Sequence, residues 1–115
     1  MQVTRIGDAK PYDAPKHHGG HMLRLQGHDA SDAQAYWVGL SHFLPGGGAD
    51  RDASPLEKVY VVLSGEVTVT TDDGEATLGP MDSCYLGPDE ARTVVNRTNL
   101  PASMLVVMTY PEGAR

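Results

Sequence analysis

Apolar and polar residues alternate in short blocks along this chain, and glycine or proline separates the blocks. Residues 66–71 read EVTVTT, an alternation typical of a strand with one buried face. Residues 58–63 read KVYVVL and are dense in β-branched and aromatic side chains, which favour strands. Asp73-Gly74 comes just after residues 66–71 and predicts a tight hairpin, because both central positions tolerate positive φ. No stretch of ten residues repeats with the period of a helix, so the pattern predicts strands throughout.

The expected strands cover residues 22–26, 35–44, 58–63, 66–71, 75–78, 83–86, 92–96 and 102–109. Pro45-Gly46-Gly47-Gly48 is expected to break the chain after the second strand. Short strands at near-regular spacing predict an all-β sandwich or barrel over residues 22–115. Residues 1–21 are rich in Pro, Gly and His, among them His17, His18 and His21. They predict an extended N-terminal arm, either a solvated loop or a lid over a pocket.

Length and charge narrow the classes of function. The chain has 115 residues, which is enough for one domain. Its formal net charge of −6 argues against nucleic acid and anionic membrane surfaces as partners. No apolar run approaches the ~20 residues of a membrane span. Cys84 is the single cysteine and cannot form an internal disulfide, and no signal core opens the chain, so the expected location is cytoplasmic.

Two segments carry glycines at a spacing that resembles the two motifs of the cupin family. The matching residues are Gly46, Val59, Leu63, Gly65 and Glu66 in the first segment and Gly79, Gly87, Pro88 and Asn96 in the second. The resemblance covers roughly residues 35–110. It implies a single-domain jelly-roll barrel of the RmlC-like type, with an interior cavity that takes a small molecule.

The metal-binding positions of that family carry different residues here. In the family, two His and one Glu of the first motif and one His of the second hold a divalent cation. These positions fall on Asp52, Ser54, Lys58 and Arg92. Arginine has no lone pair to offer a metal, so we expect neither a metal nor another cofactor. A rearranged ligand set of His42, Asp52 and Glu57 is the alternative.

Four of the replacement residues and their neighbours are candidates for binding a substrate. Arg92 is expected to hold an anionic group, or else to bridge permanently to Asp52, Glu57 or Glu90. Adjacent strand residues point to opposite faces, so only one of Glu57 and Lys58 should enter the barrel. Tyr85, together with Asp52 and Glu57, completes the expected substrate-binding set.

Three residues are candidates for acid/base catalysis. His42 is interpreted either as a base at the barrel mouth or as a core histidine. Tyr60 and Lys58 share strand parity, so a lysine beside the phenol would lower the pKa of Tyr60. The alternative for Tyr60 is packing at the barrel rim. Trp37 and Phe43, with Tyr36, are expected in the core or on a dimer surface.

These residues predict a metal-independent lyase, dehydratase or isomerase that acts on a small anionic or carbonyl compound. A non-catalytic ligand-binding or sensing barrel is the second hypothesis, and a metal-dependent dioxygenase is the third. The resemblance also implies a homodimer that pairs through residues 22–26.

Overall fold

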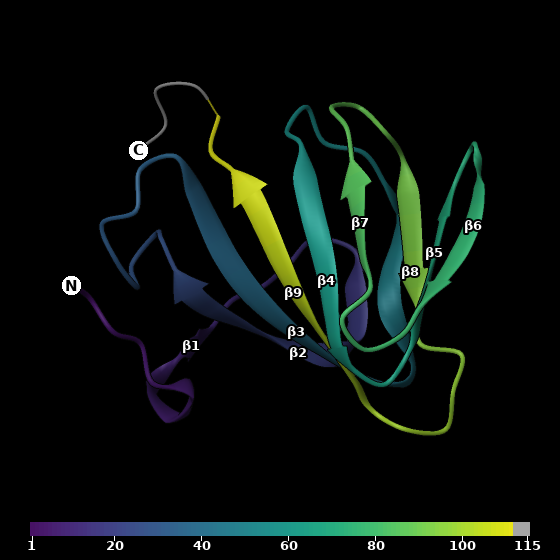
Figure 1. Ribbon diagram of the computed structural model, residues 1–115, viewed down its shortest axis with the longest axis horizontal. Helices are drawn as coiled ribbons and strands as arrows, with labels where there is room; N and C mark the ends of the chain where they lie inside the picture. Colours follow the sequence, from purple (N-terminus) through teal and green to yellow (C-terminus); the bar gives the residue numbers. More distant parts are fainter. Residues whose placement is uncertain (112–115) are drawn as a thin grey trace.

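A computed structural model describes residues 1–111 of the chain, and it is almost entirely β-structure (Figure 1). No helix in this part of the chain is long and apolar enough to cross a membrane. In order, the elements are the 3-10 helix η1 (Ile6–Asp8) and the strands β1 (Lys10–Pro11), β2 (His17–Gln26), β3 (Tyr36–Asp52), β4 (Lys58–Ser64), β5 (Val67–Thr71), β6 (Gly74–Leu78), β7 (Ser83–Leu86), β8 (Arg92–Val95) and β9 (Ala102–Thr109).

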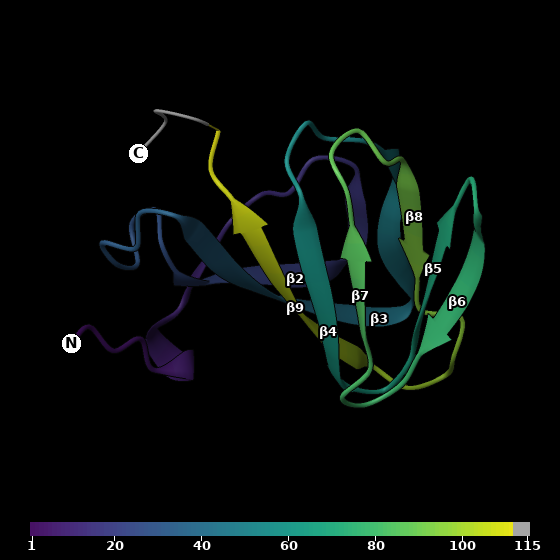
Figure 2. The ribbon, with the colours of Figure 1, turned by 45° about the horizontal axis from the view of Figure 1, so that its top comes forward.

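The strands curl into a nearly closed jelly-roll barrel, which confirms the predicted all-β fold class. Their order is β6-β5-β8-β3-β9-β4-β7, and β2 pairs with β3 and β1. Figure 2 shows β4, β7, β8 and the β5–β6 hairpin around one end, while β2 extends to the other side. The bounds of β7 and β9 match the sequence expectation, and β2 begins at His17, earlier than the expected start at residue 22.

The glycines of residues 46–48 do not end a strand, contrary to the sequence expectation. β3 runs through them for 17 residues and belongs to both halves of the barrel. Its first part pairs with β9, and its second part pairs with β8. A Cβ on Gly48 would collide with the carbonyl of Val94 on β8, and one on Gly47 would collide with Gly19 on β2. The missing side chains therefore let three backbones pass close together instead of breaking the strand.

Alternation along the strands separates the barrel interior from its surface. On β4, Lys58, Tyr60 and Val62 are buried, whereas the intervening Val59 and Val61 are only half-buried. β9 and β8 alternate in the same way. The apolar core that results contains Met22, Phe43, Ala49, Tyr60, Val62, Val67, Val69, Leu78, Leu86, Val94, Ala102, Met104 and Val106.

Asn96 ties the loop after β8 to the barrel from a fully buried position. Its side-chain amide donates to the carbonyls of Phe43 at 3.1 Å and Leu100 at 2.8 Å. Its side-chain oxygen accepts from the backbone and hydroxyl of Thr98. All hydrogen-bonding capacity of the side chain is therefore used inside the fold, which accounts structurally for the asparagine of the second motif.

Asn96→Asp should destabilise the fold by at least about 2 kcal/mol, because a carboxylate oxygen would face two carbonyls with no proton to donate. Chemical unfolding measures this loss, and Asn99→Asp, at an exposed position of the same loop, serves as the matched control. Equal stability of the two variants would contradict the role given to Asn96.

Candidate functional site

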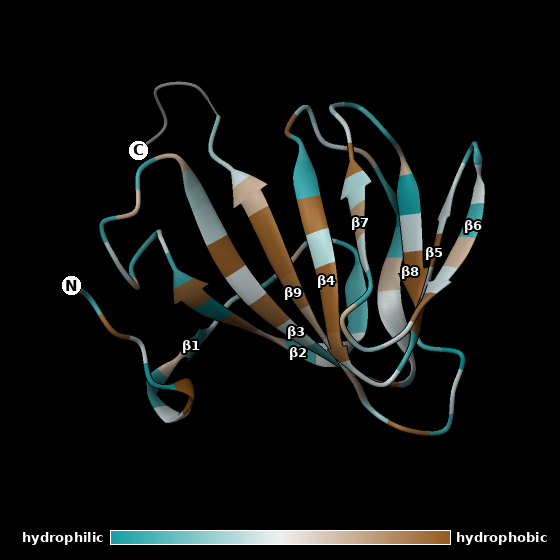
Figure 3. Ribbon diagram, viewed as in Figure 1, coloured by the Kyte–Doolittle hydropathy of each residue, from teal (hydrophilic) through white to brown (hydrophobic). Residues whose placement is uncertain are grey.

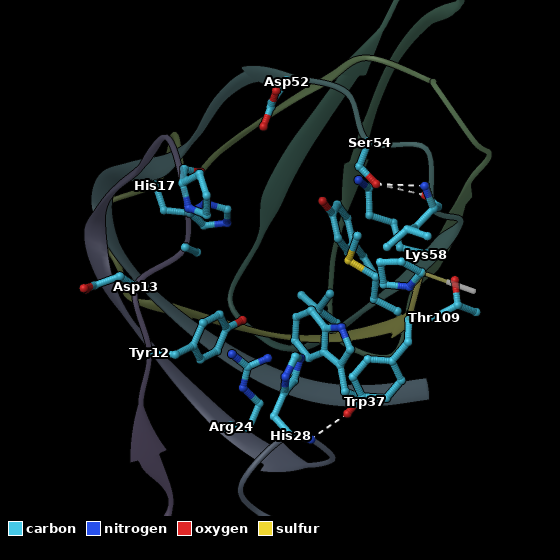
Figure 4. A pocket seen from close by; sticks show the side chains of 18 of the residues that line it. Tyr12, Asp13, His17, Arg24, His28, Trp37, Asp52, Ser54, Lys58 and Thr109 are labelled. Carbon is cyan, nitrogen blue, oxygen red and sulfur yellow. Dashed lines mark hydrogen bonds between the residues drawn. The ribbon is translucent and has the colours of Figure 1, made fainter. Parts of the chain in front are cut away.

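A cavity of about 400 Å³ opens at one end of the barrel. Figure 4 looks into it and shows side chains that converge from β2, β3, β4 and the segment before β2. This volume lies in the range of small-molecule sites. Its described lining residues are Tyr12, Asp13, Ala14, Pro15, His17, Arg24, His28, Trp37, Asp52, Ala53, Ser54, Leu56, Lys58, Tyr60, Arg92, Val106, Met108, Thr109, Tyr110 and Pro111.

All four residues at the motif's metal positions line this cavity. Asp52 and Ser54 come from the end of β3 and the following loop, Lys58 begins β4, and Arg92 begins β8. The starts of β4 and β8 appear in Figure 3 as hydrophilic bands at the same end of the barrel. The sequence therefore predicted correctly which positions meet, and it predicted that only one of Glu57 and Lys58 faces inward. That residue is Lys58.

Arg92 and Tyr60 form a buried hydrogen-bonded pair on the cavity wall. The Nε of Arg92 donates to the Tyr60 hydroxyl at 2.8 Å, and Nη1 donates to the backbone carbonyl of Asp50 at 3.0 Å. Burial raises the pKa of Tyr60, and the charge and hydrogen bond of Arg92 oppose that rise. Tyr60 accepts from Arg92, and its own proton is not donated to any residue in 1–111. That proton remains available to a ligand.

No carboxylate within residues 1–111 forms an ion pair with Arg92 or Lys58. The permanent bridge from Arg92 to Asp52, Glu57 or Glu90 that the sequence left open is therefore not formed. Asp52 instead pairs with Lys16 at 3.4 Å. Burial lowers the pKa of Lys58, and the charge of Arg92 lowers it further. Two buried cations thus face one cavity without a carboxylate in ion-pair contact, which favours an anionic ligand.

His17 is a functional candidate that sequence reasoning did not identify. Its Nδ1 lies 2.8 Å from the carbonyl of Pro15, and a carbonyl only accepts, so Nδ1 carries the proton. In the neutral ring the lone pair is then on Nε2, which no residue of the described chain contacts by a hydrogen bond. Burial lowers the pKa of His17, and the charge of Arg92 adds to this effect. The ring stacks on Phe43, and the lowered pKa favours its neutral form, which keeps the lone pair on Nε2.

The opposite wall of the cavity is aromatic. Trp37 lines it with Tyr12, whose ring meets the indole edge-on at a centroid distance of 5.7 Å. The guanidinium of Arg24 lies over both rings. Figure 4 shows Arg24 and Trp37 on the side of the cavity away from Asp52 and Ser54. Trp37 packs against the core, as one of the sequence expectations had it, and it also lines the cavity.

Three of the expected site residues lie outside the cavity. His42 shares the face of Val38 and Leu40, whereas Trp37 and Phe43 point inward, and its Nδ1 lies 2.8 Å from the Ser103 hydroxyl. Placing His42 at the barrel mouth is therefore wrong. Glu57 and Tyr85 are exposed and hydrogen-bond to each other at 2.8 Å on the outer surface. Strand alternation puts both on the opposite face from Lys58 and Tyr60.

The donor set does not fit a divalent metal. No group of three or more His, Cys, Asp or Glu side chains within residues 1–111 is arranged to hold one. At the motif positions, the ammonium of Lys58 and the guanidinium of Arg92 would repel a cation. The rearranged set of His42, Asp52 and Glu57 does not converge, because His42 and Glu57 face outward. We therefore derive no chemistry through a metal.

The sequence profile of the Cupin domain family matches residues 39–108. The chain belongs to the cupin family. The polyketide cyclase RemF from Streptomyces resistomycificus is a similar solved structure, with a TM-score of 0.83 at 18% identity, over 95% of this cupin and 79% of that chain. Because the identity is low, this likeness shows the fold alone.

Two further comparisons involve proteins named for sugar chemistry. A protein from Mycobacterium tuberculosis named Beta-D-galactosidase is 44% identical over 111 residues, which is 96% of each chain. A sugar phosphate isomerase of the cupin superfamily from Silicibacter pomeroyi is 26% identical, with a TM-score of 0.67 over 78% of this cupin and 60% of that chain. Both similarities extend over most of the present chain.

Lys58→Met should raise the free energy of unfolding by about 1 kcal/mol near pH 7, because it removes an unpaired ammonium from the cavity. The folded pKa of Lys58 lies below its ordinary value of 10.5, so between the two values the unfolded chain binds more protons. Wild-type stability therefore rises with pH in that window, and the advantage of the variant shrinks.

Urea unfolding near pH 7 and again at about pH 9.5 measures this difference. Lys10→Met, at an exposed position on β1, is the matched control and should show no gain. A wild-type protein as stable as Lys58→Met near neutral pH would contradict the unpaired state of Lys58.

Proposed function

We propose that this cupin is an enzyme that performs metal-independent acid/base chemistry on a small anionic or carbonyl compound held in the barrel cavity. The observation that carries the proposal is the pair of buried cations, Lys58 and Arg92, which face the cavity with no carboxylate partner beside a hydroxyl that keeps its proton. Such a site is complementary to an anion in the resting state or to an oxyanion that forms during reaction.

The side chains supply an acid and a base on the walls of one cavity. His17 offers the lone pair of Nε2, and Tyr60 offers its phenolic proton. A proton next to a carbonyl would pass to His17 while the carbon–oxygen double bond opens. The charge would develop on the carbonyl oxygen beside Lys58 and Arg92, and Tyr60 would protonate it to give an enediol. The reverse steps at the neighbouring carbon complete an isomerisation, so atoms and charge balance.

Carbohydrates are the first substrates to consider, because the relative named Beta-D-galactosidase and the neighbour named sugar phosphate isomerase both carry sugar names. An aldose phosphate combines the two features that the site favours, an anionic group and a carbonyl.

The further hypotheses, a ligand-binding module without turnover and a homodimer, stay predictions. Along β2, the edge proposed for dimer pairing is already occupied by β1 at Leu23 and Arg24.

The enediol route predicts that the hydrogen next to the carbonyl of an aldose phosphate exchanges with deuterium in heavy water, which NMR measures. His17→Gln should lower kcat by ~100-fold or more and leave KM nearly unchanged, whereas Arg92→Ala should raise KM. The assay is run with EDTA and with the metal content of the protein measured.

His21→Gln is the matched control, because His21 lies on the same strand but does not line the cavity. Absence of exchange across a panel of aldose phosphates, or full exchange in His17→Gln, would reject this route. Loss of exchange with EDTA would reject metal independence.

The second candidate function is hydrolysis of a β-D-galactoside, which the 44% identical relative favours. Glycoside hydrolysis ordinarily needs two carboxyl groups, one on either side of the scissile bond. Asp13 and Asp52 are the two carboxylates among the described lining residues, and Figure 4 shows them on separate parts of the rim. They are the residues that would serve as acid and base.

Hydrolysis of 4-nitrophenyl β-D-galactopyranoside, followed by release of nitrophenolate, tests this candidate. If it holds, Asp13→Asn and Asp52→Asn should each lower kcat by ~100-fold or more, because each removes a carboxyl group from proton transfer or nucleophilic attack. Asp73→Asn, in the exposed hairpin between β5 and β6, should retain wild-type activity. Release by wild type and both variants at the same rate would exclude these aspartates.

A further inference from the structure

Arg24 occupies an unusual position on the aromatic wall of the cavity. Its Cζ lies 3.9 Å from the centroid of the Tyr12 ring and 4.5 Å from that of the Trp37 ring. Gly39 makes room for this arrangement, since a Cβ there would lie within 3 Å of both Tyr12 and Trp37. The two rings, which meet at an interplanar angle of 84°, hold the guanidinium in the corner between them.

The N–H groups of Arg24 have no acceptor within residues 1–111. No hydrogen bond from its side chain is formed to these residues, and no carboxylate there lies within 4.0 Å. A guanidinium carries five donors in a rigid fork. The two rings confine the guanidinium before anything binds, so a ligand with oxygen acceptors would meet a donor group that is already in place.

The two ends of the cavity differ in how much charge they leave uncompensated. The charge of Arg24 is offset by the two ring faces and by the nearby carboxylate of Asp29, which counters the fall in the pKa of Arg24 that burial causes. At the other end, the single carboxylate of Asp52 offsets part of the charge of Lys58 and Arg92, and these two cations repel each other. A full negative charge is therefore best placed between Lys58 and Arg92, while uncharged oxygens suffice at Arg24.

We propose that Arg24, Tyr12 and Trp37 form a second subsite that binds the hydroxyl groups of a sugar ring. The substrate is then a sugar that carries one anionic group, a phosphate or carboxylate, at the Lys58–Arg92 end. This inference rests on the proposed function for the anionic end alone. The cavity volume of about 400 Å³ exceeds what a lone phosphate fills, and Val106 and Met108 add apolar side chains to its lining.

Calorimetric titration of wild type with inorganic phosphate, with galactose and with each galactose monophosphate tests the second subsite. At least one sugar phosphate should bind about tenfold tighter than either half alone, because it engages both ends. Arg24→Lys keeps the charge but loses the planar fork, so it should weaken the sugar phosphate about tenfold and leave phosphate within about twofold. Arg92→Lys should weaken the binding of both phosphate and the sugar phosphate. Arg51 pairs with Asp72 on the surface, so Arg51→Lys is the matched control.

Tyr12→Leu removes one stacking ring and provides a second test if Arg24→Lys does not fold, with the same selective loss expected. Sugar phosphates that bind no tighter than phosphate would overturn the subsite, as would an Arg24→Lys variant that weakens phosphate equally. Galactose binding that depends on Arg24, with no binding of phosphate, would keep the subsite and overturn the proposed anionic end. Failure of all probes to bind would overturn both.

Discussion

The close crossing of three strands at the glycines of β3 is the constraint on which the barrel depends. There β3 leaves the half of the barrel that it shares with β9 and enters the half that it shares with β8. The backbone of Asn96 hydrogen-bonds to Gly46 and Gly47 at this crossing, and its side chain fixes the next loop. The crossing therefore fixes the end of β8, and the register of β8 on β3 then places Arg92, at the start of β8, opposite Asp52.

The cavity keeps the four converging positions of a metal-binding barrel but carries different side chains at them. Residues at the four motif positions still converge, and two of them are cations. Each of these cations carries a single positive charge on the cavity wall, where a metal ion would place its charge at the centre. The space in the middle is left for a ligand, and Tyr60, oriented by Arg92, gives that ligand a proton donor at a fixed place.

Local patterns in the sequence predicted most of the strands and the side of the cavity formed by Lys58, Tyr60 and Arg92. Contacts between distant segments decided the remaining side. Alternation placed Lys58 and Tyr60 on one face and Glu57 on the other, because that property depends only on neighbouring residues. The inward face of β3 could not be chosen in this way, since His42 and Trp37 lie on opposite faces and both suit a site. Only the packing of Trp37 against Tyr12 and Arg24, residues far earlier in the chain, decides it.

Part of the cavity lies outside the segment that matches the cupin family. The matched segment begins at residue 39, whereas Tyr12, His17, Arg24 and Trp37 all precede it. A chain that shares only the matched segment would contain Lys58 and Arg92, but it would lack His17 and the aromatic wall of the cavity. The segment before residue 39 therefore supplies residues that decide which ligand the barrel holds, while residues 39–108 supply the barrel itself.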